Sequence, residues 1–274
     1  MKYIVYGFVT IMSDVCHSCK KRAASLRYHG SGRLVCSPCF SQEFERHFVR
    51  SIGRESMLRP MGRILVGISG STSSLALSYL LEKSERHLPN VKLIHVHLDR
   101  WHDDAEEEII STFHRKYLSS ELKVFKIESL CDLWENKALS GSISGTPNLR
   151  CMNCKSITRR AIFKAARRIG VQYVSLGETL DEYLSEKLLR IWLAGQSRNL
   201  SSFFHDKNVF GLKLSRPLSF SLGEEVKLYM QAKEIETNFF SCPFEDGIRK
   251  SLVRAVNNIE AKSPGILSSF RSLA

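Results

Sequence analysis

The sequence lacks any run of eighteen consecutive apolar residues, so we expect no membrane-spanning helix. Its first ten residues are largely apolar, but no basic region extends beyond Lys2 and no small-residue cleavage site follows, which argues against a signal peptide. Neither the dinucleotide fingerprint GxGxxG nor a Walker lysine-threonine pair is present. We therefore expect a cytoplasmic protein without either of these two common phosphate-binding loops.

Acidic residues are scarce relative to basic ones. The chain has 28 Asp and Glu against 40 Lys and Arg, and its formal net charge is +12. Such an excess of positive charge favours a polyanionic partner, most simply a nucleic acid. The alternative is a basic protein that neighbours the ribosome or pairs with an acidic subunit.

Cysteine is plentiful, with eight residues in 274. Six of them form three C-x-x-C pairs, and Cys131 and Cys242 stand apart. Without a secretory signal, this spacing indicates metal ligands in a reducing compartment and not a disulfide framework. The paired cysteines are Cys16 and Cys19, Cys36 and Cys39, and Cys151 and Cys154.

The first two pairs predict a zinc site. Sixteen residues separate Cys19 from Cys36, which is long enough for a hairpin that brings the second pair back to the first. Four thiolates in tetrahedral geometry favour zinc over an iron site or free thiols. We expect residues 1–55 to form a small zinc module, with a helix at 40–52 that packs it onto the rest of the chain. A structural role is preferred.

Residues 60–274 alternate between predicted strands and helices. This order predicts an α/β domain with a doubly wound parallel sheet, in which ligands bind beyond the carboxyl ends of the strands. The expected strands are 63–69, 91–98, 122–127 and 171–176, and the expected helices are 75–81, 106–118, 155–169, 184–192, 223–233 and 248–259.

Small and polar residues follow three of these strands. The run SGSTSS joins the first strand to a helix, a geometry that presents backbone N–H groups to an anion, although an ordinary helix-capping turn reads the same way. Asp99 ends the second strand, and the run GETLDE begins after the fourth. Glu178, Asp181 and Glu182 could bind Mg²⁺ or orient a nucleotide, or cap the next helix. The candidate ligand-binding residues are Ser69, Gly70, Ser71, Thr72, Ser73, Ser74, Asp99, Gly177 and Asp181.

Beyond its first residue, Lys155, the predicted helix at 155–169 carries five basic residues and no acidic one. This composition suits a surface that contacts nucleic-acid phosphates, and it also suits a plain solvated face. The candidate nucleic-acid contacts are Arg159, Arg160, Lys164, Arg167 and Arg168.

Taken together, these motifs resemble the PP-loop tRNA thiolation proteins, specifically the cytosolic pair that 2-thiolates the wobble uridine. The shared features are the four-cysteine knuckles ending in CxxCF, the strand-SGxxxS-helix, a C-x-x-C opening an RR-containing helix, GETLDE, RPL and a late cysteine, over most of residues 16–274. The resemblance implies an ATP-pyrophosphatase domain, with Mg²⁺, that adenylates the uridine C2 oxygen before sulfur from a carrier protein replaces it.

The family's phosphate loop is SGGKDS, which maps onto Ser69–Ser74. Its lysine and aspartate are replaced here by Thr72 and Ser73. The resemblance therefore favours the degenerate partner branch, a subunit that binds tRNA and forms a heterodimer with a catalytic PP-loop subunit.

Cys151, Cys154 and Cys242 nevertheless match three family cysteines that hold a 4Fe-4S cluster or carry sulfur. An alternative is thus an active ATP-dependent sulfurtransferase, with Cys151 and Cys242 as its catalytic cysteines. A second alternative is a zinc-containing nucleic-acid-binding protein without transfer chemistry.

Overall fold

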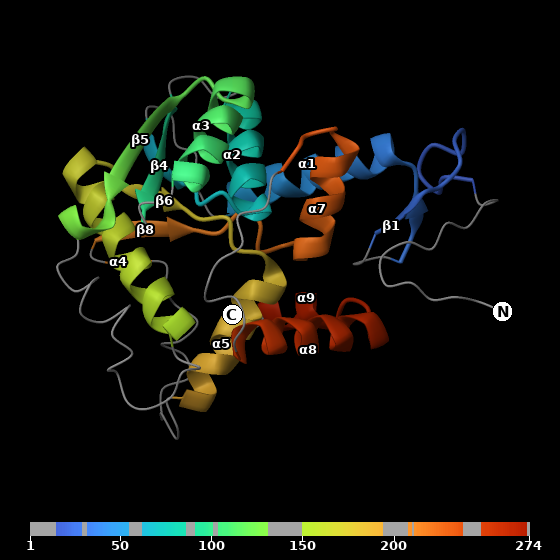
Figure 1. The fold of residues 1–274 in the computed structure, drawn as a ribbon. Helices are drawn as coiled ribbons and strands as arrows, with labels where there is room; N and C mark the ends of the chain where they lie inside the picture. The colour runs from blue at the N-terminus through green and yellow to red at the C-terminus, as the bar shows by residue number, and fades with distance from the viewer. Residues whose placement is uncertain are drawn as a thin grey trace.

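A computed structural model places two short strands and a long helix beside a larger α/β domain (Figure 1). Strands β1 (Leu26–Arg27) and β2 (Leu34–Val35) pair antiparallel, and helix α1 (Ser37–Arg54) follows them directly. None of the described helices is both long and apolar enough to cross a bilayer. The structure describes residues 15–28, 32–54, 62–85, 91–100, 104–130, 150–193, 208–209, 211–237 and 248–272.

The larger domain is built on a six-stranded sheet in the order β5-β4-β3-β6-β8-β7. All neighbouring strands are parallel except β7, which pairs antiparallel with β8 at one edge. This confirms the predicted α/β class with a parallel sheet. The strands are β3 (Arg63–Gly67), β4 (Lys92–Asp99), β5 (Glu121–Lys126), β6 (Tyr173–Ser175), β7 (Asn208–Val209) and β8 (Leu212–Ser215).

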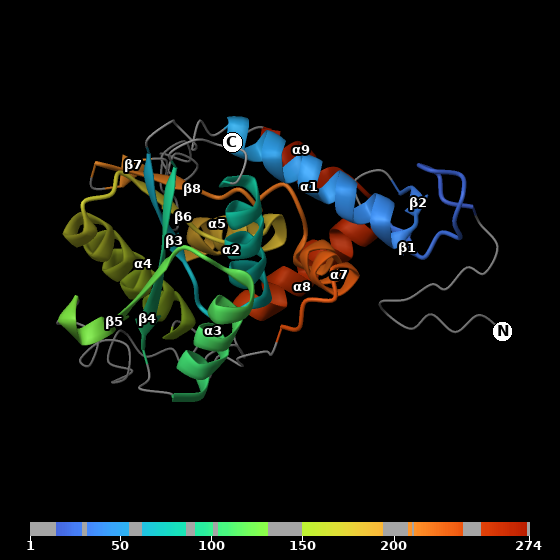
Figure 2. The ribbon, with the colours of Figure 1, turned by 90° about the horizontal axis from the view of Figure 1, so that it is seen from above.

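Helices cover both faces of the sheet, as Figure 2 shows. Helices α2 (Thr72–Glu85) and α3 (Asp104–Tyr117) pack on one face, and α4 (Arg150–Ile169) packs on the other. Consecutive β4 side chains alternate between these two cores, because strand residues point to opposite faces in turn. The remaining elements are the 3-10 turn η1 (Ile127–Ser129) and helices α5 (Leu180–Leu193), α7 (Gly223–Ala232), α8 (Ile248–Lys262) and α9 (Ile266–Ser272).

Helix α1 joins the N-terminal module to the larger domain through a row of phenylalanines. Phe40, Phe44 and Phe48 are fully buried at helical spacing, as the sequence predicts. The ring of Phe44 stacks on Tyr229 of α7 with centroids 4.6 Å apart. The two parts of the chain therefore share one hydrophobic core.

Strand β4 also buries a histidine, which predicts a pH-dependent stability. His95 is fully buried, and desolvation lowers its pKa to about 4. An unfolded histidine titrates near pH 6.5, so between pH 6.5 and 4 the unfolded chain binds the extra proton and the folded chain loses stability as the pH falls. From pH 7 to pH 5 we expect a loss of about 2 kcal/mol in the free energy of unfolding.

Urea unfolding at pH 7, 6 and 5 measures this loss. The variant His95→Leu should reduce the acid loss by about 2 kcal/mol and leave the part that comes from His97, which is also buried with a lowered pKa. His17→Gln, which alters an exposed histidine, should keep the full loss. Carboxylates such as Glu82 titrate below this window. An acid loss of the same size in the wild type and in His95→Leu would show that His95 is not its source.

Candidate functional site

The segment Ser69–Ser74 forms a tight loop between β3 and α2. Gly70 adopts a left-handed backbone conformation with φ of 72°, which glycine allows without strain. The Ser69 N–H donates to Ser74 Oγ at 3.1 Å, and the Ser74 N–H donates to Ser71 Oγ at 3.3 Å. The first turn of α2 therefore begins beside a ring of hydroxyl groups, a geometry suited to an anion.

A cavity of about 340 Å³ opens at this loop, at the carboxyl ends of β3, β4 and β6. This is where a doubly wound sheet binds its ligands. The wall also includes residues from α4, from the β6–α5 connection and from the start of α8. Among the loop residues, those that line the cavity are Ser69, Ser71, Ser73 and Ser74.

Gly177 brings the β6–α5 connection against the loop. A Cβ atom at this position would lie 2.6 Å from the Ser73 carbonyl oxygen and 3.0 Å from the Ser74 Cα. Only glycine permits that approach, since the clashing atoms are backbone. Gly177 also lines the cavity.

The two candidate aspartates lie elsewhere. Asp99 ends β4 but does not line the cavity, and the next residue, Arg100, does. The Asp181 carboxylate accepts hydrogen bonds from Thr179 Oγ1 at 2.7 Å, from Gly223 N at 3.0 Å and from Asn257 Nδ2 at 3.1 Å. Asp181 thus ties α5 to the start of α7 and to the middle of α8.

Glu178 and Glu182 line the cavity, but their surroundings differ. Burial would raise the pKa of Glu178, yet Lys155, Arg159 and Arg216 hold it well below its usual range. Burial raises the pKa of Glu182, whose carboxylate lies 3.6 Å from an Arg249 nitrogen. Of these two carboxylates, Glu182 is in contact with fewer cations.

Several cavity residues were not expected from the sequence. His97 lines the wall and its Nδ1 lies 3.2 Å from the Ile68 carbonyl oxygen, while burial lowers its pKa. Arg100, Lys155 and Arg249 add positive charge from three different elements. Arg249 lies more than 170 residues beyond the loop, so no local pattern signals its position.

Cys154 is a buried cysteine in the cavity wall. It lies in the second turn of α4, with its Sγ 4.0 Å from Thr158 Oγ1, and it faces the same cavity as the Ser69 loop. Cys151 lies one turn earlier in the same helix. The Cys151 side chain, Cys131 and Cys242 lie outside the described part of the structure.

The basic helix α4 divides its charges between two sides. Four of the five candidate residues are exposed, but Arg159 points inward and donates to Glu186 Oε1 at 3.0 Å and to Glu178. The basic surface of α4 therefore has four of the five expected residues. The exposed members are Arg160, Lys164, Arg167 and Arg168.

The first four cysteines converge at the N-terminal module. One sulfur atom from each of Cys16, Cys19, Cys36 and Cys39 lies within 4.8 Å of all the others, and the sulfurs of Cys19 and Cys36 are 3.9 Å apart. A tetrahedral zinc–thiolate site has sulfur atoms about 3.8 Å apart, from Zn–S bonds of about 2.3 Å. The donor set and its spacing fit zinc.

The thiols of this cluster differ in how readily they lose a proton. Burial would raise the pKa of Cys16, but backbone N–H groups of Cys19, Cys36 and Ser18 lower it to about 6. Burial and the neighbouring thiols raise the pKa of Cys39 to about 12. Four thiolates therefore do not form together without a positive ion to balance them.

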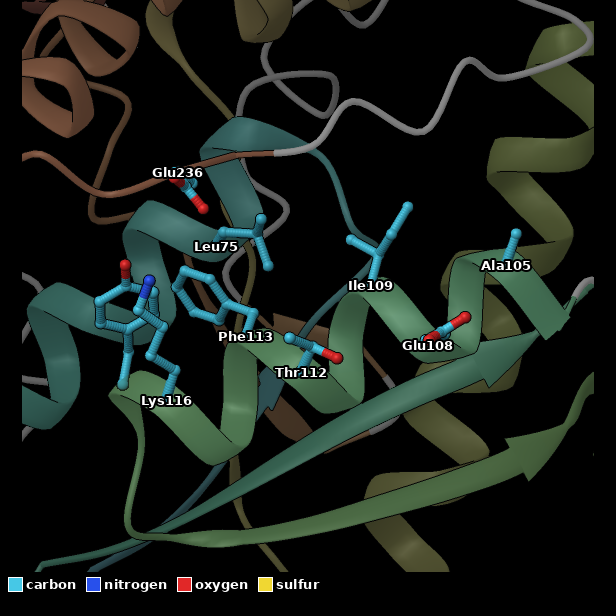
Figure 3. A pocket seen from close by; sticks show the side chains of 9 residues that line it. Leu75, Ala105, Glu108, Ile109, Thr112, Phe113, Lys116 and Glu236 are labelled. Atoms are coloured by element: carbon cyan, nitrogen blue, oxygen red, sulfur yellow. The ribbon is translucent and has the colours of Figure 1, made fainter.

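A second hollow, of about 380 Å³, lies between α2 and α3 (Figure 3). Phe113 and Leu75 form its apolar floor, and Glu108, Lys116 and Glu236 surround it. It shares no residue with the cavity at the Ser69 loop. The Ser69 loop, Glu182 and Cys154 thus belong to the first cavity and not to this second hollow.

The parallel sheet, the strand–loop–helix and the cavity define a doubly wound α/β protein with a candidate ligand site at the carboxyl ends of its strands. The structure superposes on the U34-tRNA thiolase NcsA from Methanococcus maripaludis, described with its [4Fe-4S] cluster, with a TM-score of 0.80, 21% identity and coverage of 95% of this chain and 86% of that one. At that identity the likeness establishes the fold.

No protein-family model matches the chain. Curated proteins that are similar in sequence are named as a sulfurtransferase or as tRNA 2-thiolation proteins. A protein of Methanocaldococcus jannaschii named "Probable sulfurtransferase" is 27% identical over 98% of this chain and 82% of its own length. Cytoplasmic tRNA 2-thiolation protein 1 of Kluyveromyces lactis is 24% identical over 93% of this chain and 70% of its own length. The mouse protein of that name is 29% identical over 81% of this chain and 54% of its own length.

These relatives correct the expected branch. The sequence analysis favoured the degenerate partner subunit, because the loop lacks the family's lysine and aspartate. The relatives instead carry the name of thiolation protein 1, and the structural neighbour is a thiolase. In this chain, backbone N–H groups and serine hydroxyls hold the loop together.

Proposed function

We propose that this chain is a catalytic-type tRNA sulfurtransferase that places sulfur on C2 of the wobble uridine, U34. The observation that carries the proposal is that the Ser69–Ser74 loop and Cys154 line one cavity. A nucleotide-binding loop and a cysteine at one site suit a reaction that activates an oxygen and then replaces it with sulfur. The relatives named as thiolation proteins support this assignment.

We assign the cavity residues two roles, the binding of ATP phosphates and the binding of Mg²⁺. The loop N–H groups and hydroxyls would bind ATP phosphates, with Arg100 and Arg249 supplying the positive charge that the loop lacks. Glu182 offers a carboxylate for Mg²⁺. The uridine C2 oxygen attacks the α-phosphorus and releases pyrophosphate, and sulfide then displaces AMP from C2. A sulfur-carrier protein would deliver that sulfur in the cell.

Cys154 is the described member of the proposed sulfur site. Together with Cys151 and Cys242 it would hold a 4Fe-4S cluster, which when bound supplies or relays sulfur. The buried thiol in the cavity wall fits this use, because soft thiolates are the usual ligands of such clusters. We also propose zinc in the four-cysteine cluster and, from the names of the relatives, a cytoplasmic location.

Pyrophosphate exchange tests the activating step. The wild type should exchange labelled pyrophosphate into ATP only when tRNA is present. Gly177→Ala should lower the exchange rate by about a hundredfold, since its Cβ would displace the Ser73 backbone. The control Gly53→Ala places a Cβ in open space and should leave the rate unchanged. A wild type that binds tRNA but shows no exchange would contradict the catalytic assignment and favour a nucleic-acid-binding protein.

The exposed face of α4 is proposed to contact tRNA phosphates. Replacing Arg160, Lys164 and Arg168 together by alanine should weaken tRNA binding by about ten- to a hundredfold and flatten its salt dependence. Fluorescence anisotropy across a potassium chloride series measures both quantities. A triple variant of exposed residues elsewhere, Lys227, Arg254 and Lys262, is the control. Equal losses in the two triple variants would show that charge alone, and not this face, governs binding.

A further inference from the structure

A buried ionic network forms part of the wall of the cavity. The Glu178 carboxylate accepts from Arg159 on one oxygen and from Arg216 on the other, each at 2.5 Å. Lys155 Nζ lies 2.9 Å from Glu178 Oε1 and 2.5 Å from Glu186 Oε2. Arg159 also reaches Glu186, at 3.0 Å. Glu178 is thus the hub, since it is the member that contacts all three cations.

This network joins four parts of the chain. Lys155 and Arg159 lie on α4, one and five residues after Cys154. Glu186 lies on α5, and Arg216 follows β8. Glu178 itself lies in the connection between β6 and α5. The start of α4, which carries the C-x-x-C pair, is therefore fastened to the body of the domain by charge-assisted hydrogen bonds.

The neighbour of the hub fixes the other side of the cavity. Gly177 packs so closely on the loop that a Cβ would meet the Ser73 carbonyl oxygen at 2.6 Å. Gly177 thus contacts the Ser69–Ser74 loop, and the next residue, Glu178, binds the cysteine-bearing helix α4. The distance between the loop and Cys154 is set through this dipeptide.

The network suits a positioning role better than direct binding of a ligand. Glu178 is almost fully buried, and the Lys155 ammonium nitrogen is shielded from solvent while it faces two carboxylates. Three cations surround two carboxylates, so the loss of Glu178 leaves an uncompensated buried charge beside Cys154.

We propose that Glu178 is a positioning residue that holds Cys154 and the start of α4 at a fixed distance from the Ser69 loop. This inference rests on the proposed function, in which the thiol and the activated uridine share the cavity. Glu178 thereby keeps the site of sulfur transfer at a fixed distance from the site of adenylation.

The alkylation rate of Cys154 by iodoacetamide, followed by tandem mass spectrometry on the full chain, tests the position of the helix without any assay of activity. The thiol is 5% exposed, so the wild type should react slowly. Glu178→Gln should raise the rate by about tenfold or more, because release of α4 opens the site. Glu178→Asp keeps the charge and should restore much of the protection. Glu224→Gln, at an exposed glutamate of α7, should match the wild type.

Lys155→Met provides a second variant if Glu178→Gln does not fold. It leaves two cations against two carboxylates, so no buried carboxylate loses all its partners while one link to α4 is lost. We expect alkylation about threefold faster than in the wild type. Unchanged alkylation in every folded variant of this pair would overturn the positioning role.

Kinetics separates this inference from the proposed function. Glu178→Gln should lower kcat for thiolation by about a hundredfold and leave KM for ATP near its wild-type value, with partial recovery in Glu178→Asp. A wild type that forms no thiouridine, yet shows the predicted alkylation pattern, would remove the function and keep the positioning. An active wild type, with kcat and alkylation unaffected by Glu178→Gln, would remove the positioning alone.

Discussion

Cys154→Ser should lower the rate of tRNA thiolation by about a thousandfold or more, with little change in the fold. Serine differs from cysteine by one atom and fits the same space, so the packing of α4 against the sheet is retained. A serine hydroxyl neither carries sulfur nor holds iron as a thiolate does, because it stays protonated at neutral pH. The chemistry is lost although the structure remains.

Thiolation by Cys154→Ser is measured alongside its tRNA affinity and its melting temperature. The neighbouring variant Ser156→Ala, at an exposed position of the same helix, is the control and should keep full activity. Retention of wild-type thiolation by Cys154→Ser would place the sulfur chemistry elsewhere. A large fall in melting temperature would instead indicate a structural thiol.

Removal of the metal from the four-cysteine cluster should unfold the N-terminal module. Residues 15–36 bury few large apolar side chains of their own, so the cross-link made by the metal supplies most of their stability. Binding of zinc to such a site contributes about 10 kcal/mol or more at neutral pH. Cys36→Ser should have the same effect, since three thiolates hold zinc far less well than four.

Metal analysis combined with limited proteolysis checks this second expectation. The wild type should contain one zinc per chain in this module and resist cleavage between β1 and α1. Treatment with a strong chelator, or Cys36→Ser, should release the zinc and expose that segment. Cys154→Ser is the matched control and should keep its zinc. A module that resists proteolysis without metal would contradict a structural zinc site.

The sequence predicts the elements that local patterns determine. The run from Arg63 to Ser69 is apolar and then small, and it forms β3 and the start of the loop. The phenylalanines of α1 recur at helical spacing and are buried as expected. Strand β8 was missed, because four residues with two leucines give too weak a pattern to separate from a loop.

Local sequence patterns do not predict which side chains line the cavity. Asp181 lies in an acidic run after a strand, yet three hydrogen bonds turn it toward α7 and α8. Arg159 belongs to a basic helix, but its guanidinium meets Glu178 and Glu186 in the interior. Tertiary partners decide both cases, and spacing along the chain does not reveal them.

The charge of the Ser69–Ser74 loop illustrates the same limit. Two missing side chains, at Thr72 and Ser73, favoured the partner subunit. In the folded chain, positive charge at the cavity comes from residues outside the loop, among them Arg100, Lys155 and Arg249. The loop alone has fewer charged residues than the cavity that it lines.

The central claim is that this chain thiolates U34 of tRNA. The direct measurement is mass spectrometry of nucleosides from tRNA incubated with the anaerobically reconstituted chain, ATP, Mg²⁺ and sulfide. The account predicts 2-thiouridine at position 34, formed only with ATP and lost in Cys154→Ser. The absence of 2-thiouridine from the complete reaction, with tRNA bound and iron and zinc in place, would contradict it.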